Sequence, residues 1–185
     1  HKIKDTAIFN SCAVTSESVR QVKQSIRKRR REFPDEKIIV TGCAAQIEPE
    51  TFSKMQEVDL VSGNIEKRDI LNILSKEKSS KKIEVQNIME NRQNLNGLTD
   101  GYDNRSRAFI EIQNGCDHRC TFCIIPFGRG NSISKSVKNI INEINLMIEK
   151  GHKEIVLTGV DIASWGHDLD KKSNLGFLVK KILRG

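Results

Sequence analysis

The sequence predicts an α/β protein, in which an open parallel sheet domain is followed by the start of a β/α barrel. Short apolar runs alternate with amphipathic segments over residues 6–74 and again from residue 108 onward, as is typical of βα units. Between these parts, residues 76–107 are rich in Lys, Ser, Asn and Gln. The 185 residues suffice for two small cores. We expect domains over 1–75 and 108–185, joined by a linker over 76–107.

The N-terminal part is predicted to begin with a strand at residues 6–9. Thr15 or Ser16 then caps a helix that Pro34 ends. Its buried side is expected to carry Val19, Val22, Ile26 and Phe33. Buried strands follow at 37–41 and 58–61, and a helix at 67–74 is expected to turn Ile70, Leu71 and Leu74 inward. A short strand around Ile83, Val85 and Ile88 is expected within the linker.

The second part is predicted to open with a strand at 108–113. Ser134 or Ser136 caps the next helix, which ends at Lys150 and Gly151. A strand at 154–158 comes next and leads into a loop from Gly159 to Asp161. The buried stripe of the helix is expected to contain Val137, Ile140, Ile141, Ile144 and Ile148. A complete eight-fold barrel takes about 250 residues, so the sequence is expected to stop within the barrel.

Charge points to a polyanionic partner. The net charge is +7, and no acidic residue interrupts the seven basic residues between Arg20 and Arg31. This run is either a solvated helix face or an RNA contact. The residues proposed for RNA contact are Arg27, Lys28, Arg29, Arg30 and Arg31. No apolar run reaches the ~20 residues that a membrane span needs, so no membrane role is expected.

Three cysteines follow the predicted strand at 108–113. Cys116, Cys120 and Cys123 have the spacing Cys-x3-Cys-x2-Cys, with Phe122 before the last. Thiolates are the usual ligands of iron–sulfur clusters, and three of them leave one iron of a four-iron cluster open. Zinc would need a fourth ligand, which His118 is too close in sequence to provide comfortably. An odd total of five cysteines disfavours a disulfide framework.

This spacing and its surroundings resemble the radical S-adenosylmethionine (SAM) methylthiotransferases. The matching segments are 109–115 (FIEIQNG), 124–130 (IIPFGRG) and 10–15 (NSCAVT). Segments 40–46 (VTGCAAQ) and 157–162 (LTGVDI) are most similar to the members that modify threonylcarbamoyladenosine in tRNA. The resemblance implies that Cys116, Cys120 and Cys123 hold a 4Fe-4S cluster whose open iron binds SAM. Gly159 and Asp161 would contact SAM, with simple turn residues at the strand end as the alternative. Phe122 would pack on the adenine or the cluster, with a plain core aromatic as the alternative.

The same resemblance implies a second, auxiliary 4Fe-4S cluster. Cys12 and Cys43 would be two of its three thiolate ligands, since each follows a strand at the ligand-binding edge of a parallel sheet. From spacing alone, two such cysteines would more often be buried small hydrophobes than ligands. The family's third cysteine would lie upstream of His1, and its RNA-binding β-barrel is absent. We therefore expect a fragment of the protein. Arg129 and Lys135 would contact RNA phosphate or a SAM carboxylate, or would be surface charges.

The implied activity is addition of a methylthio group to C2 of threonylcarbamoyladenosine beside the tRNA anticodon. Alternatives are another tRNA adenosine, a ribosomal protein, or a non-catalytic iron–sulfur module. Implied partners are tRNA and an electron donor such as flavodoxin or ferredoxin, and we expect a cytoplasmic monomer. The truncated chain is not expected to complete methylthiolation alone.

Overall fold

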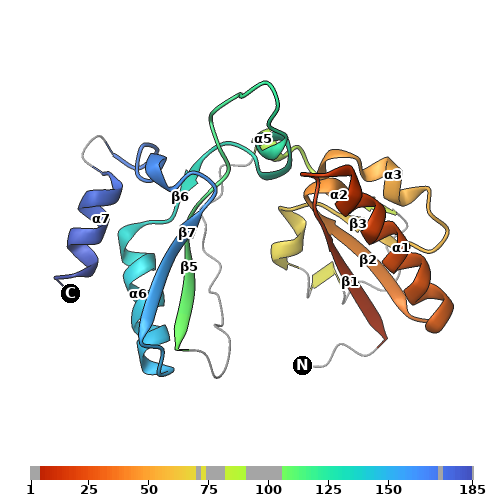
Figure 1. Cartoon of the computed structure of the whole chain (residues 1–185), viewed down its shortest axis with the longest axis horizontal. Coiled ribbons are helices and arrows are strands. Elements are labelled where there is room, and N and C mark those ends of the chain that lie inside the picture. Colours follow the sequence, from red (N-terminus) through yellow and green to blue (C-terminus); the bar gives the residue numbers. More distant parts are fainter. Residues whose placement is uncertain (1–4, 70–71, 74–81, 91–105, 171–172, 185) are drawn as a thin grey trace. The chain divides into compact units, whose positions relative to one another are not determined.

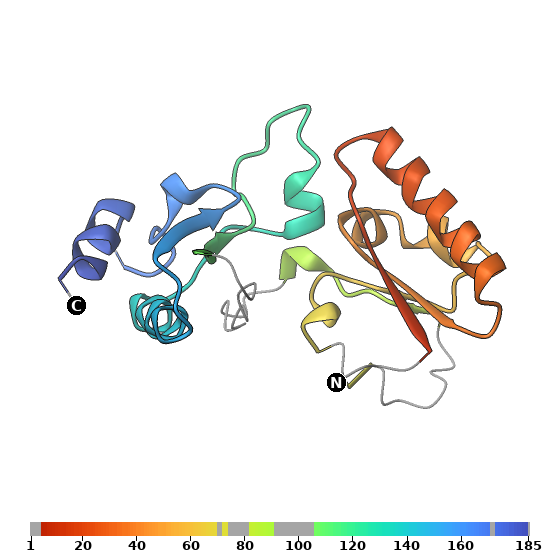
Figure 2. The same ribbon diagram turned by 60° about the horizontal axis from the view of Figure 1, so that its bottom comes forward.

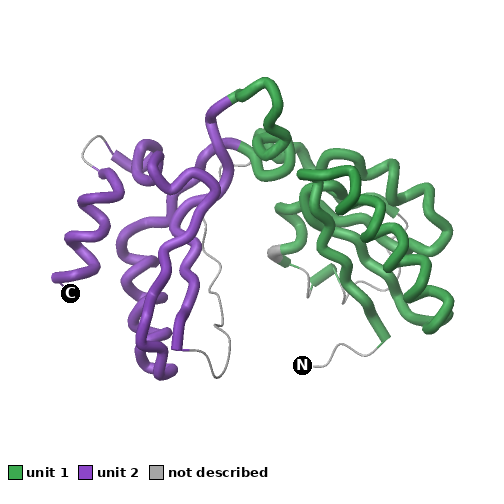
Figure 3. Tube along the Cα trace, in the orientation of Figure 1, with its two compact units in different colours: residues 1–91, 119–130 green, residues 92–118, 131–185 purple. Residues whose placement is uncertain are grey.

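The computed structural model describes residues 5–69, 72–73, 82–90, 106–170 and 173–184, which belong to two compact units (Figures 1 and 3). Unit 1 comprises His1–Asn91 and Arg119–Gly130, and unit 2 comprises Arg92–His118 and Asn131–Gly185. Unit 1 has a parallel sheet with helices, and unit 2 has a mixed sheet, so the predicted α/β class is confirmed. Within the described part of the chain, every helix is too short or too polar to cross a membrane.

The sheet of unit 1 has the strand order β1-β2-β3-β4, with all neighbours parallel. The strands are β1 (Thr6–Ser11), β2 (Lys37–Gly42), β3 (Leu60–Ser62) and β4 (Ile83–Glu84). The first three lie where the apolar runs predict them, and β4 is the short strand expected near Ile83. Parallel pairing places the carboxyl ends of all four strands at one edge of the sheet, which is where ligands bind in open α/β sheets.

Helix α1 (Ser16–Glu32) begins and ends as the capping residues predict. The Ser18 backbone N–H donates to Thr15 Oγ1 at 3.1 Å, and Pro34 follows the last turn. Ile26 is fully buried against the sheet, with Val19 and Val22 partly buried around it. The inward placement of Phe33 is wrong, because its ring is 45% exposed. It lies past the helix end, and the Arg29 guanidinium lies 3.9 Å from its ring centre.

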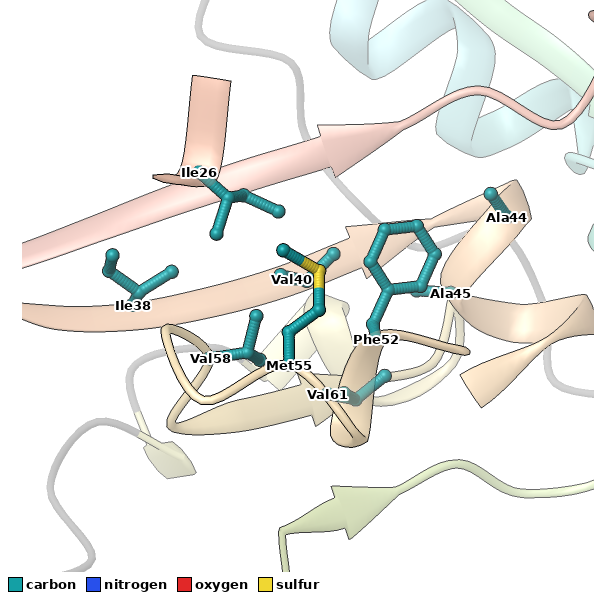
Figure 4. Packing of buried hydrophobic residues seen from close by; sticks show 9 residues of the cluster. All are labelled: Ile26, Ile38, Val40, Ala44, Ala45, Phe52, Met55, Val58 and Val61. Carbon is teal, nitrogen blue, oxygen red and sulfur yellow. The ribbon is translucent and has the colours of Figure 1, made fainter. Parts of the chain in front are cut away.

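Figure 4 shows the core between α1, the sheet, and the short helices α2 (Cys43–Ile47) and α3 (Pro49–Ser53). Nine buried residues form it: Ile26, Ile38, Val40, Ala44, Ala45, Phe52, Met55, Val58 and Val61. Full burial of such a side chain stabilises the fold by about 1.5–3 kcal/mol. Beyond β3 lies the 3-10 helix η1 (Glu66–Asp69). Ile73 packs with Ile39 and Leu60, whereas the predicted inward residues Ile70, Leu71 and Leu74 lie outside the described residues.

Unit 2 contains a βαβ arrangement. Strand β5 (Arg107–Asn114) pairs in parallel with β7 (Glu154–Gly159) and antiparallel with β6 (Ile133–Ser134), and α6 (Val137–Glu149) connects β6 to β7. The 3-10 helix η3 (Ile162–Ser164) and α7 (Leu175–Ile182) follow (Figure 2). Its core contains Ile110, Ile112, Ile140, Met147, Trp165 and Leu178. The predicted β/α pattern of this part is confirmed.

Helix α6 starts at the predicted cap, where Ser136 Oγ accepts a hydrogen bond from the Asn139 N–H at 3.3 Å. Its predicted stripe is partly wrong. Ile148 is 56% exposed, and Met147 is buried instead. At about 3.6 residues per turn, position 147 returns to the face of Ile140 after nearly two full turns, whereas position 148 has rotated away from it.

Candidate cofactor sites

Cys12 and Cys43 lie at the carboxyl edge of the first sheet. They follow directly after Ser11 and Gly42, the last residues of β1 and β2, which are paired in register. Both cysteines are free thiols. Cys12 is exposed and Cys43 is half-buried. The two thiol-bearing residues therefore follow neighbouring strands of one sheet, as the sequence predicts.

The turn from β2 into α2 sets the position of Cys43. Gly42 has a φ of +98°, and a Cβ on it would collide with the Ser11 backbone and the Asn10 side chain. Ser11 Oγ donates to the Thr41 carbonyl at 2.6 Å and accepts from the Ala45 N–H at 3.0 Å. Ser11 thus ties the end of β1 to the first turn of α2, which begins at Cys43.

The Cys43 sulfur lies among nitrogen donors of unit 1. Arg129 Nε donates to Cys43 Sγ at 3.1 Å. Asn64 Nδ2 lies 3.8 Å from the same sulfur and donates to the Gly128 carbonyl at 2.6 Å. Asn64 is itself buried, and its backbone N–H donates to Gln46 Oε1 at 2.8 Å. The sequence analysis did not single out Asn64, although its place after β3, at the same sheet edge as Cys43, could have indicated it.

The three closely spaced cysteines lie in the segment between β5 and α5 (Ile125–Arg129). Cys116 belongs to unit 2, and Cys120 and Cys123 belong to unit 1. All three are free, and none is fully buried. The Cys123 N–H donates to the Cys120 carbonyl at 3.0 Å. Among the described residues, no three His, Cys, Asp or Glu side chains are gathered as a metal centre.

Phe122, between these cysteines, is 91% exposed. Its interpretation as a plain core aromatic is therefore wrong, because the ring contributes little to either core. An exposed aromatic beside free thiols suits contact with a bound group. The thiolate-forming donors and the irregular backbone of residues 115–120 fit a soft, sulfur-ligated metal cluster.

Gln113 links two loops of unit 2. Its side chain is fully buried at the end of β5. Nε2 donates to the Gly115 carbonyl at 2.7 Å and to Ser132 Oγ at 2.9 Å. Oε1 accepts the backbone N–H groups of Val160 at 3.0 Å and Asp161 at 2.8 Å. One amide therefore fixes the start of the cysteine loop against the loop after β7.

Gly159 is the last residue of β7, and Asp161 lies in the loop that follows it. A Cβ on Gly159 would approach the Gln113 carbonyl oxygen to 2.8 Å, so the close passage of the two strand ends requires glycine. Asp161 Oδ2 lies 3.4 Å from His118 Nε2, a residue of the cysteine loop in the same unit. The sequence analysis missed Gln113 and this His–Asp pair. A glutamine in a buried strand is the pattern that could have indicated the former.

Lys135 is neither a surface charge nor available to a phosphate, which corrects both interpretations. It is 3% exposed, and its Nζ lies 2.6 Å from Oε2 of Glu143, which is 1% exposed. Lys135 directly follows β6, and its ammonium group forms a buried ion pair with Glu143 of α6. Glu143 falls on the buried side of α6, and sequence reasoning missed it.

The basic run of α1 divides into two groups. Arg29 Nη2 donates to Glu36 Oε1 at 2.7 Å, and this hydrogen bond lowers the pKa of the Glu36 carboxyl and raises that of Arg29. Arg30 donates to the Glu36 and Glu57 carbonyls at 2.7 and 2.8 Å. Three further basic residues of the run line a shallow depression of about 670 Å³ with Gln21, Gln24 and Ser25: Arg27, Lys28 and Arg31.

Comparisons with known proteins match both parts of the chain. Residues 2–63 match the family described as uncharacterized protein family UPF0004, and residues 110–180 match the radical SAM superfamily. A threonylcarbamoyladenosine tRNA methylthiotransferase, MtaB, of Rickettsia prowazekii is 44% identical over 98% of this chain and 42% of its own length. The chain thus joins a UPF0004 segment to a radical SAM segment, and it is similar over nearly its whole length to a methylthiotransferase.

Other relatives agree with this placement. MtaB of Aquifex aeolicus is 36% identical over 97% of the chain and 44% of its own length. A tRNA-2-methylthio-N(6)-dimethylallyladenosine synthase of Clostridium novyi is 30% identical over 96% of the chain and 41% of its own length. The chain spans about two fifths of the length of these curated relatives. Membership of the radical SAM family implies SAM and a 4Fe-4S cluster as cofactors.

Proposed function

We propose that this chain is part of a methylthiotransferase that adds a methylthio group to C2 of N6-threonylcarbamoyladenosine beside the tRNA anticodon. The observation that carries this proposal is the Cys-x3-Cys-x2-Cys motif at the end of β5, in a chain similar over 98% of its length to a relative named for this activity. The relatives' names specify a tRNA nucleoside. The net charge of +7 suits an RNA substrate.

We assign the SAM-binding cluster to Cys116, Cys120 and Cys123. When bound and reduced, such a cluster cleaves SAM and supplies a radical for hydrogen abstraction. The protein's share is binding and orientation. Gln113 holds Gly115 and the Val160–Asp161 backbone together, which fixes the cysteine loop against a proposed SAM-contacting loop. Phe122 offers an exposed ring for adenine or the cluster, and Gly159 and Asp161 would contact SAM.

We assign a second, auxiliary 4Fe-4S cluster to Cys12 and Cys43, together with one further thiolate. Two observations support this assignment. The cysteines follow register-paired residues at one sheet edge, and the Cys43 sulfur already accepts a hydrogen bond from Arg129. A thiol that accepts from a guanidinium is suited to bind as a thiolate.

We retain the domain boundaries 1–75, 76–107 and 108–185 as proposals. Arg27, Lys28 and Arg31 are the better candidates for tRNA contact. Arg29 and Arg30 donate short hydrogen bonds to Glu36 and the Glu57 carbonyl, whereas the ion pairs of Arg27 with Glu57 and of Lys28 with Glu32 are long, at 3.9 and 3.8 Å. The remaining proposals are an electron donor such as flavodoxin or ferredoxin, a monomeric state and a cytoplasmic location.

Anaerobic reconstitution tests the assignment of the SAM cluster. The protein should bind about four irons at Cys116, Cys120 and Cys123, since a 4Fe-4S cluster uses local thiolates. The reduced protein should convert SAM to 5′-deoxyadenosine and methionine. Alanine variants of these three cysteines should lose these four irons, the share of the brown absorbance that they contribute, and SAM cleavage, while any iron of the proposed auxiliary cluster remains. Variants with full iron would refute the assignment, and a protein that keeps its cluster but never cleaves SAM would favour a non-catalytic module.

Dimethylallyladenosine is the second candidate substrate. It rests on the Clostridium novyi relative, whose name specifies that nucleoside and which matches over 96% of the chain. Nucleoside analysis separates the two candidates, because the methylthiolated products differ in mass.

A further inference from the structure

The backbone on both sides of Arg129 is closely packed in unit 1. Arg129 is half-buried, and both neighbours in the chain are buried glycines. A Cβ on Gly128 would lie 3.0 Å from Cys43 Cβ and 3.3 Å from its sulfur. Gly130 has a φ of +82°, and a Cβ there would lie 2.8 Å from the Ile88 carbonyl oxygen. Gly128 thus allows the backbone beside Arg129 to approach α2 closely, and Gly130 allows it to approach Ile88.

The side chain of Arg129 also forms a hydrogen bond to the Cys43 sulfur. Arg129 Nε donates to Cys43 Sγ at 3.1 Å. Buried Asn64 donates to the Gly128 carbonyl at 2.6 Å and reaches the same sulfur at 3.8 Å. Asn64 therefore anchors the backbone of the segment that delivers the guanidinium. A surface cation that contacted only solvent or RNA would need no such anchoring.

We propose that Arg129 is a positioning residue for the auxiliary cluster, donating a charge-assisted hydrogen bond to the ligand sulfur of Cys43 with Asn64 as its support. This inference rests on the proposed auxiliary cluster at Cys12 and Cys43. Hydrogen bonds to ligand sulfurs raise the reduction potential of iron–sulfur clusters, because they stabilise the more negative reduced state. Arg129 therefore raises the potential of the cluster and slows loss of its iron.

Arg129 also lies only six residues after Cys123 in the sequence. The segment that carries the last SAM-cluster cysteine is thus the one that supplies the donor to Cys43. The structure assigns Arg129 this role in place of the RNA contact predicted from sequence.

The test uses the full-length, anaerobically reconstituted protein in a background where Cys116, Cys120 and Cys123 are serine. Only the auxiliary cluster then contributes to the spectra. Redox titration by electron paramagnetic resonance gives its midpoint potential, and a chelator gives its rate of iron loss. Arg129→Met removes both charge and donors, whereas Arg129→Lys keeps the charge without Nε–H. Arg20→Met, at an exposed arginine paired with Glu17, is the matched control.

Arg129→Met should shift the midpoint potential to a more negative value and speed iron loss. Arg129→Lys should give a smaller shift of the same sign, and Arg20→Met none. Arg129 variants with the potential of the parent would overturn the inference while leaving the auxiliary cluster in place. A parent protein without any cluster signal would overturn the proposed auxiliary site and this inference together. If Arg129→Met does not fold, as judged by far-ultraviolet circular dichroism, the lysine variant decides.

Discussion

Replacement of Lys135 by methionine should destabilise unit 2 strongly. The ammonium group lies 2.6 Å from the Glu143 carboxylate, and the two residues are 3% and 1% exposed. Methionine fills a similar volume but leaves the carboxylate buried without its cation. Breaking a buried pair from one side costs about 3–5 kcal/mol, whereas replacing both partners by apolar residues is often neutral. The double variant Lys135→Met/Glu143→Leu should therefore recover most of the stability.

The single tryptophan provides the assay. Trp165 is fully buried in the core of unit 2, and its indole N–H donates to the Lys135 carbonyl at 3.0 Å. Urea unfolding followed by its fluorescence reports on this region directly. Lys138→Met, at an exposed position of α6, is the control and should change the free energy of unfolding by less than about 0.5 kcal/mol. The reasoning is refuted if Lys135→Met costs no more than this control, or if the double variant is as unstable as the single one.

Three further predictions concern the proposed sites and the first unit. Gln113→Leu removes the acceptor of two backbone N–H groups. Because each lost hydrogen bond contributes ~0.5–1.5 kcal/mol, SAM affinity should fall about tenfold at unchanged iron content. Unchanged affinity, measured by equilibrium dialysis, would contradict the positioning role of Gln113. Replacing Arg27, Lys28 and Arg31 by glutamine should make tRNA affinity less dependent on salt. The slope of log affinity against log salt concentration should fall by roughly 0.7–0.9 for each lost phosphate contact. An unaltered slope would mean that these residues of α1 face only solvent. The hydrogen bond from Arg29 lowers the pKa of Glu36 in the folded state. This carboxylate therefore stabilises the fold above the unfolded pKa of about 4.3, and its contribution is lost as the pH falls through the lower folded pKa. Urea unfolding followed by circular dichroism should show the difference between the parent and Glu36→Gln shrink as the pH falls below the unfolded pKa.

The element order could be predicted because periodicity and capping are local properties. Thr15 and Ser136 cap the helices as expected, and β1, β2, β5 and β7 lie on the predicted apolar runs. The partners of charged side chains could not be predicted. A basic run does not show that Arg30 reaches the Glu57 carbonyl, which is 27 residues away.

In the candidate sites, too, the residue types could be predicted from the sequence, whereas their contact partners could not. The cysteines could be identified as candidate ligands from their spacing and from the family resemblance, because residue type and spacing do not depend on tertiary structure. The groups that orient them depend on tertiary contacts. Arg129 meets Cys43 across 86 residues, and Gln113 meets Val160 across 47. Lys135 was misinterpreted for the same reason, because its partner Glu143 is defined by the helix face and not by the local charge pattern.

We propose that this chain belongs to an enzyme that methylthiolates threonylcarbamoyladenosine in tRNA. Mass spectrometry of tRNA nucleosides from cells with the gene deleted, and from cells complemented with the full-length gene or its Cys116→Ala variant, tests this proposal most directly. We expect 2-methylthio-N6-threonylcarbamoyladenosine to disappear on deletion, to return with the parent gene and to stay absent with the variant, while N6-threonylcarbamoyladenosine accumulates. Unchanged levels of this methylthiolated nucleoside in the deletion strain, or full restoration by the Cys116→Ala variant, would contradict it.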